Sequence, residues 1–180
     1  MDTSGSVKGQ TAELLSFAVK SLLDTFGADD YIQVARFPPP EPVDNADDDD
    51  GSGTSESESL AIVECFPDLV RATTSNKRLF ADKLASLQPY GMANFNQAFK
   101  YAFDTLDKFD DMVEREKDKE LGACCPKYAN SRCHKMIMVL TDALTDSPSK
   151  LLAEKNADKN VKIFTYAMGF AAKEKKKLKV

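Results

Sequence analysis

The sequence predicts an α/β fold in which helices cover both faces of a mostly parallel sheet. Segments with apolar residues at helical spacing alternate with short runs rich in β-branched and aromatic residues. Residues 136–140 form a continuous apolar run, which is typical of a strand buried on both faces. Strands that alternate with helices in this way favour parallel strand pairing.

The first half of the chain predicts one helix and two strands. Gly27 is placed to end the helix, whose apolar residues recur at three- and four-residue steps: Leu14, Leu15, Ala18, Val19, Leu22, Leu23 and Phe26. Residues 31–37 predict a strand, which three prolines end. Residues 60–66 predict a second strand, and we expect the two strands to form a hairpin with an enlarged loop.

The second half predicts three helices and two strands. A helix over residues 76–87 is closed by Pro89 and Gly91. A longer helix starts at Phe95 and either continues through the charged residues 107–119 or frays there. After the buried strand we expect a helix through residues 151–152 and a last strand over residues 161–169.

Composition favours one globular domain over residues 1–170, because 42% of the 180 residues are hydrophobic and 29% are charged. Residues 38–59 predict an acidic disordered insertion, and residues 171–180 predict a solvated basic tail. The net charge of −5 argues against a nucleic-acid partner. No apolar run approaches the roughly 20 residues that a membrane helix needs.

Four cysteines, Cys65, Cys124, Cys125 and Cys133, show no paired spacing of the kind that zinc sites use. From the residues alone, disulfides and free thiols both remain open.

Two polar segments qualify by their composition as parts of a binding site. Asp2, Ser4 and Ser6 alternate before the first helix, and Thr141-Asp142 follows the buried strand. Carboxylate and hydroxyl oxygens are the ligands that Mg²⁺ and Ca²⁺ prefer. The alternative is structural, because Ser4 or Ser6 could instead cap the helix that follows.

The pattern Asp-x-Ser-x-Ser, followed about 140 residues later by Thr-Asp, resembles the metal-ion-dependent adhesion site of von Willebrand factor type A (VWA) domains. The resemblance implies a VWA fold in which Asp2, Ser4, Ser6 and Asp142 hold Ca²⁺ or Mg²⁺. It also implies that an acidic residue of a partner completes the ligand shell.

Further segments resemble one branch of this family, the alpha-2/delta subunits of voltage-gated calcium channels. These segments lie in order along the chain at residues 24–31, 65–70, 76–77, 98–103, 135–138 and 161–166. Cys65 and Cys133 fall at cysteine positions of that family, which implies a candidate disulfide and an extracellular setting.

Three departures from the family pattern stand out. Ala93 occupies the position of a threonine ligand, so we expect weaker metal binding, and Ala143 replaces a glycine. Only Met1 precedes Asp2, whereas the family places a central strand there. We therefore expect a fragment, an incomplete gene model or a diverged domain, and low stability for the isolated chain.

The resemblance implies a non-enzymatic interaction domain that engages the pore-forming subunit of a calcium channel and supports its delivery and current. Alternatives are another extracellular VWA protein, such as an inter-alpha-trypsin inhibitor heavy chain, and a truncated remnant without metal binding. A Mg²⁺-dependent phosphohydrolase is disfavoured, because the chain has no phosphate-cradling loop and its single histidine, His134, lies beside Cys133 at the start of a strand.

Overall fold

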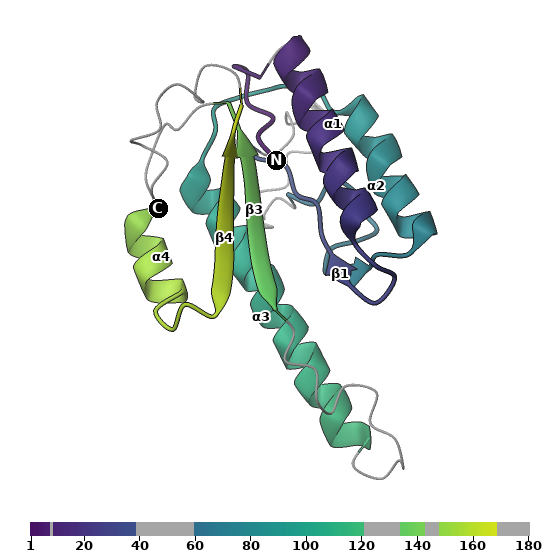
Figure 1. The fold of residues 1–180 in the computed structure, drawn as a ribbon. Helices are drawn as coiled ribbons and strands as arrows, with labels where there is room; N and C mark the ends of the chain where they lie inside the picture. Colours follow the sequence, from purple (N-terminus) through teal and green to yellow (C-terminus); the bar gives the residue numbers. More distant parts are fainter. Residues whose placement is uncertain (8, 39–59, 121–133, 143–147, 169–180) are drawn as a thin grey trace, which may run out of the picture.

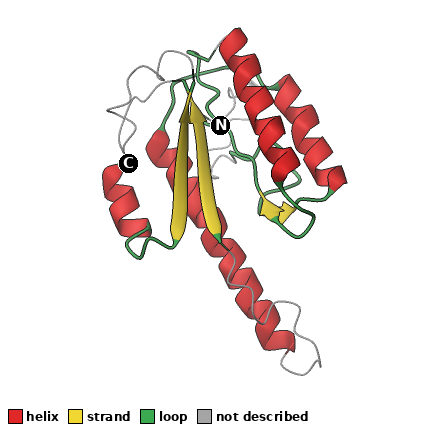
Figure 2. Cartoon of the chain, viewed as in Figure 1, coloured by secondary structure: helices red, strands yellow, loops and turns green. Residues whose placement is uncertain are grey.

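A computed structural model of the chain describes residues 1–7, 9–38, 60–120, 134–142 and 148–168, with the side chains of 116–120 left out. Helices and strands follow one another as shown in Figures 1 and 2. In chain order they are α1 (Gln10–Thr25), β1 (Tyr31–Ile32), β2 (Val70–Arg71), α2 (Thr74–Ser86), α3 (Phe95–Glu120), β3 (Lys135–Thr141), α4 (Ser149–Lys155) and β4 (Val161–Ala167).

The predicted α/β class and the parallel pairing are confirmed. Strands β3 and β4 run parallel, with Lys135 opposite Val161 and Thr141 opposite Ala167. The short strands β1 and β2 form a separate antiparallel pair. This arrangement is compatible with a partial VWA fold.

The first three residues lie between β3 and the segment 35–37. The Asp2 N–H donates to the Leu140 carbonyl (2.8 Å), and the Thr3 N–H donates to the Phe37 carbonyl (2.8 Å). The Met1 carbonyl accepts the Phe37 N–H at 3.1 Å. These bonds place the polar loop that follows Met1 beside the carboxyl end of β3.

Two hydrophobic clusters lie on opposite faces of β3. Leu140 belongs to the cluster formed with α1 and α2, whereas Ile137 and Val139 belong to the cluster formed with α3 and Leu152 of α4. Successive side chains of a strand point to opposite faces, so both clusters can use the same strand. The expectation that residues 136–140 form a strand packed on both faces is confirmed in the carboxyl-terminal half of β3.

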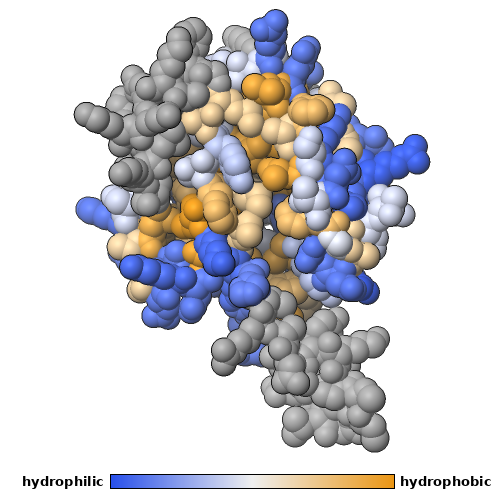
Figure 3. Space-filling view, in the orientation of Figure 1, coloured by the Kyte–Doolittle hydropathy of each residue, from blue (hydrophilic) through white to orange (hydrophobic). Residues whose placement is uncertain are grey.

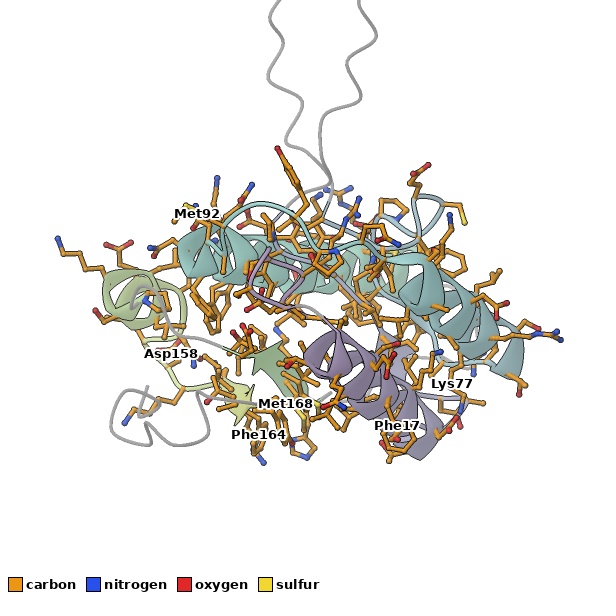
Figure 4. All side chains as sticks on the ribbon, turned by 90° about the horizontal axis from the view of Figure 1, so that it is seen from above. Phe17, Lys77, Met92, Asp158, Phe164 and Met168 are labelled. Carbon is orange, nitrogen blue, oxygen red and sulfur yellow. The ribbon has the colours of Figure 1, made fainter. Side chains whose placement is uncertain are left out.

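Exposed apolar side chains lie on one side of the molecule, on α1 and on β4. The exposed fraction is 69% for Phe17 on α1 and 42% for Phe164 on β4, and both point away from the body on the same side in Figure 4. Apolar residues also cross the middle of the β3–β4 face in Figure 3. Along β4 exposed and half-buried residues alternate, so this strand is not packed on both faces by the described residues.

The predicted strand over residues 60–66 is wrong beyond its first residues. Ala61 pairs with Ala35 and the Ile62 N–H donates to the Val34 carbonyl, which confirms the antiparallel contact. The chain then turns, because the Phe66 N–H donates to the Val63 carbonyl (2.9 Å). Pairing with β1 is taken over by β2, which the sequence pattern did not indicate.

The helix that starts at Phe95 continues through the charged stretch to Glu120, the first of the two alternatives. Outside the described residues lie positions 39–59 of the predicted acidic insertion (38–59), the predicted basic tail, and the residues Cys124, Cys125, Cys133 and Ala143. Within the described ranges, no helix has the length and hydropathy needed to cross a membrane.

Candidate metal centre

The loop after Met1 is held deep in the molecule. Asp2 is 0% exposed and Ser4 is 3% exposed, whereas Ser6 faces solvent. A carboxylate at such depth needs polar partners, because burying an unpaired charge is costly.

Both oxygens of the Asp2 carboxylate have such partners. The Ser4 N–H donates to Oδ1 at 2.9 Å, and the Thr141 hydroxyl donates to Oδ2 at 2.6 Å. The second bond joins residues 139 positions apart and ties the loop to the end of β3. The carboxylate is therefore fixed in orientation by a backbone group and by a buried side chain.

A chain of hydrogen bonds continues from Ser4 to Asp142. The hydroxyls of Ser4 and Ser6 lie 2.9 Å apart, and the Ser6 hydroxyl donates to Asp142 Oδ1 at 3.1 Å. The structure thus brings all four candidate ligands, Asp2, Ser4, Ser6 and Asp142, to one place at the carboxyl end of β3.

The capping alternative has no support in this geometry. Helix α1 begins at Gln10, its N-cap residue is Gly9, and no side-chain hydrogen bond caps the helix. The Ser4 carbonyl accepts the Val7 N–H in a turn, and the Ser4 and Ser6 hydroxyls bond each other instead of the helix.

Burial raises the pKa of the Asp142 carboxyl, the Ser6 hydrogen bond opposes this shift, and the negative charge of Asp2 adds to it. Two carboxylates held close together repel each other in their charged forms. A cation between them would relieve that repulsion, so the site favours a positive ligand.

The loop over residues 88–94 supports the polar loop (residues 2–6) through two backbone hydrogen bonds. The Gly5 N–H donates to the Gly91 carbonyl (2.8 Å), and the Tyr90 N–H donates to the Thr3 carbonyl (2.8 Å). Gly91 has a φ of 68°, and a Cβ there would lie 3.1 Å from Pro38 Cγ. The brace therefore depends on glycine at this position.

We expect Gly91→Ala to lower the free energy of unfolding by about 1 to 2 kcal/mol, because a left-handed conformation is unfavourable for a residue with a Cβ. Urea unfolding followed by circular dichroism measures the change. Gly27→Ala is the matched control, since its Cβ would have only Asp30 Oδ2 nearby, at 3.6 Å. Equal stabilities for the two variants would show that Gly91 is not required.

Ala93, at the expected threonine position, offers no side-chain oxygen and packs against the cluster that contains Phe37 and Phe95. Its neighbour Asn94 is used elsewhere, because its Oδ1 accepts the Gln97 N–H at 3.0 Å in the first turn of α3. Neither residue adds an oxygen to the four candidate ligands in this structure.

The donor set of two carboxylates and two hydroxyls suits a hard cation such as Mg²⁺ or Ca²⁺. Within the described ranges no group of three or more His, Cys, Asp or Glu side chains could hold a metal. A site in which serine supplies half of the ligands does not depend on such a group. The candidate disulfide stays a prediction, since Cys65 is exposed and Cys133 lies outside the described residues.

Thr141 is a site residue whose role the sequence did not reveal. Its position beside Asp142 drew attention, but its hydroxyl was not assigned to Asp2. We expect Thr141→Val to weaken Mg²⁺ binding about ten-fold, because a residue that orients a ligand contributes to affinity indirectly. Isothermal titration measures the affinity, and Thr165→Val on the neighbouring strand is the control. An unchanged affinity for Thr141→Val would remove this positioning role.

Comparisons with known proteins agree with the resemblance. No protein-family model matches the chain. The human voltage-dependent calcium channel subunit alpha-2/delta-2 is 28% identical over 170 residues, which cover 94% of this chain and 12% of that protein. The human alpha-2/delta-3 subunit is 29% identical over 172 residues, covering 94% of the chain and 13% of that subunit.

The chain is homologous to the alpha-2/delta subunits. A more distant relative is the Caenorhabditis elegans voltage-dependent calcium channel unc-36, which is 24% identical over 202 residues. The chain spans between 12% and 15% of the length of these relatives. This homology is consistent with the predicted VWA domain.

Proposed function

We propose that this chain forms part of a non-enzymatic, metal-dependent interaction domain in an alpha-2/delta-type auxiliary subunit of a voltage-gated calcium channel. The observation that carries the proposal is the convergence of Asp2, Ser4, Ser6 and Asp142 at one end of β3. The homology to calcium channel subunits supports the channel context.

In this proposal the four side chains hold one divalent cation. The oxygen pairs Ser4–Ser6 and Ser6–Asp142 lie 2.9 and 3.1 Å apart, close enough to share one cation. Carboxylate and hydroxyl oxygens suit both Mg²⁺ and Ca²⁺, and water would stand in place of the ligand that Ala93 lacks.

The exposed side of the site is where a partner would bind. Ser6 is exposed and Asp142 is half-buried, while Asp2 and Ser4 are buried beneath them. A bound cation would therefore present its open coordination positions to solvent, where an acidic side chain of the pore-forming subunit completes the shell. The domain then acts on the extracellular side of the plasma membrane, within a larger subunit that supports channel delivery and current.

The position of the histidine argues against histidine-based catalysis at this site. His134, the single histidine of the chain, is exposed at the start of β3, whereas the candidate ligands lie at the opposite end of that strand. A histidine that acts in general acid–base chemistry must lie within hydrogen-bond reach of the reacting atoms, which His134 does not. Turnover of a phosphate ester with Mg²⁺, lost in Asp142→Asn, would reinstate the phosphohydrolase alternative.

The test of the proposal is the affinity of the 180-residue chain for Mg²⁺ and Ca²⁺, measured by isothermal titration. We expect one site per chain that binds a divalent cation. Absence of binding for both ions would favour a remnant without a metal site. Co-expression of the longer subunit carrying Asp142→Asn with a pore-forming subunit then tests the channel role, by the calcium current at the cell surface.

A further inference from the structure

Two exposed apolar side chains, Tyr90 and Met92, lie beside the candidate metal centre. The exposed fraction is 41% for Tyr90 and 83% for Met92, the largest fraction among the large apolar side chains of the described residues. In Figure 4, Met92 lies on the opposite side of the molecule from Phe17 and Phe164. Met92 is therefore separate from the apolar side chains exposed on α1 and β4.

Backbone hydrogen bonds fix the position of Met92 relative to the metal centre. The Thr3 carbonyl accepts the Tyr90 N–H, and the Gly91 carbonyl accepts the Gly5 N–H, both at 2.8 Å. Thr3 and Gly5 alternate with the three candidate ligands of the polar loop. Because Met92 follows Gly91 directly, its Cα lies within about 10 Å of the Gly5 nitrogen.

The exposure of Met92 does not come from a loosely held loop, because its neighbours are anchored on both sides. Gly91 is bonded to the polar loop, and Ala93 packs against the hydrophobic cluster of α3. Asn94 Oδ1 accepts an N–H of the first turn of α3, and Phe95 is 1% exposed. The backbone thus holds an apolar side chain in solvent, so a partner that covers it pays little to order the loop.

Met92 also lies close to the open side of the metal centre. Ser6 is exposed and Asp142 is half-buried, so a bound cation would be reached from solvent on their side. Ser6 is joined to Gly5 by a peptide bond, and Gly5 is bonded to Gly91. A chain that brings a carboxylate to the cation therefore passes within reach of the Met92 side chain.

We propose that Met92, with Tyr90 beside it, determines which acidic segments the metal centre binds. The occupant is an extended segment of the pore-forming subunit that carries an aliphatic side chain two residues from the carboxylate on the cation. In an extended chain such side chains share one face and lie about 7 Å apart, which suits the short separation of Met92 from the polar loop. This inference rests on the proposed metal-dependent function.

An apolar contact supplies the selectivity that the cation lacks. Any aspartate or glutamate can complete the ligand shell, so the metal alone does not distinguish one acidic segment from another. Methionine is unbranched and flexible, and it packs against aliphatic side chains of different shapes. Removing the exposed part of its surface from water corresponds to about a ten-fold gain in affinity.

The test compares two peptides, blocked at both ends, that bind to the ¹⁵N-labelled 180-residue chain in saturating MgCl₂. One is glycine-glutamate-glycine-leucine-glycine, and in the other serine replaces the leucine. Amide shifts by NMR give both affinities, and the Mg²⁺ affinity is measured first. We expect the leucine peptide to bind about ten-fold tighter to the wild-type chain, and chelation of Mg²⁺ with EDTA to abolish binding of both.

Variants assign this preference to Met92. We expect Met92→Ala to reduce it to less than about two-fold while the Mg²⁺ affinity stays unchanged, because the side chain adds no ligand. Met92→Leu keeps the preference, and so does the control Phe17→Ala, which removes an exposed apolar side chain on the opposite side of the molecule.

The outcomes separate this inference from the proposed function. Mg²⁺ binding with equal affinities for the two peptides, or a preference that survives in Met92→Ala, would overturn the role of Met92 and leave the metal site intact. Loss of Mg²⁺ binding in the wild-type chain would overturn both. Self-association of the wild-type chain in MgCl₂ that disappears in Met92→Ala, measured by sedimentation, would show instead that a second copy covers this surface.

Discussion

Replacing Asp142 with asparagine weakens Mg²⁺ binding at least about 100-fold while the fold is kept. Asparagine has nearly the same shape as aspartate. Its amide oxygen can still accept a hydrogen bond from the Ser6 hydroxyl, which lies 3.1 Å from Oδ1 of Asp142 in the structure. It removes the negative charge, and with it both the cost of burying that charge and the smaller repulsion from Asp2, which together raise the pKa of Asp142. The site then has one carboxylate in place of two.

Isothermal titration of the two proteins measures this effect. Asp158→Asn is the matched control, because Asp158 is exposed in the turn before β4 and lies away from the loop (Figure 4). Circular dichroism confirms that the variants are folded. Wild-type affinity in Asp142→Asn would exclude Asp142 as a ligand, while equal losses in both variants would indicate a non-specific effect of charge.

For the isolated 180-residue chain, the free energy of unfolding rises by about 3 kcal/mol between pH 5 and pH 8, because burial lowers the pKa of the Met1 amino group from 8.0 to about 5. Above pH 8 this amine is neutral in both the folded and the unfolded chain. As the pH falls, the unfolded chain takes up a proton that the folded chain excludes, so stability is lost until about pH 5.

Urea unfolding at several pH values between 5 and 8 measures this dependence. The control is the same chain acetylated only at the Met1 nitrogen, which keeps the N–H that bonds Ala35 and removes the titrating group. We expect a much flatter profile for the acetylated chain. The same slope in both proteins would mean that another group is responsible.

Local patterns in the sequence predicted most of the helices and strands. The apolar spacing of α1 and the continuous run of β3 depend on neighbours within a few residues, and both were predicted close to their observed limits. The pairing of β1 with β2 was missed, because two-residue strands leave no period to detect. The turn at residues 63–66 was also missed, since its apolar residues pack in the core without extending a strand.

The candidate ligands were found by the resemblance and not by spacing, because Ser4 and Ser6 alone are equally suited to cap a helix. Contacts between residues that lie far apart in the sequence could not be predicted from it. Examples are the bond from Thr141 to Asp2, the brace from Gly91 to Gly5 and the burial of the Met1 amino group. Each depends on how the segments assemble, which no local pattern encodes.

The expected low stability of the isolated chain stays a prediction, and the structure indicates where to look for its cause. The backbone edges of Met136 and Gln33 face an apolar groove without partners among the described residues. Unpaired backbone groups at such a position cost free energy.

The most direct test of the metal site is an NMR titration of the ¹⁵N-labelled chain with MgCl₂, following each backbone amide. The proposal predicts saturable shifts, one ion per chain, largest at Ser4, Ser6 and Asp142, with little change at Asp158. Shifts spread over the exposed acidic residues without saturation, or none at the polar loop, would contradict a metal centre at this end of β3.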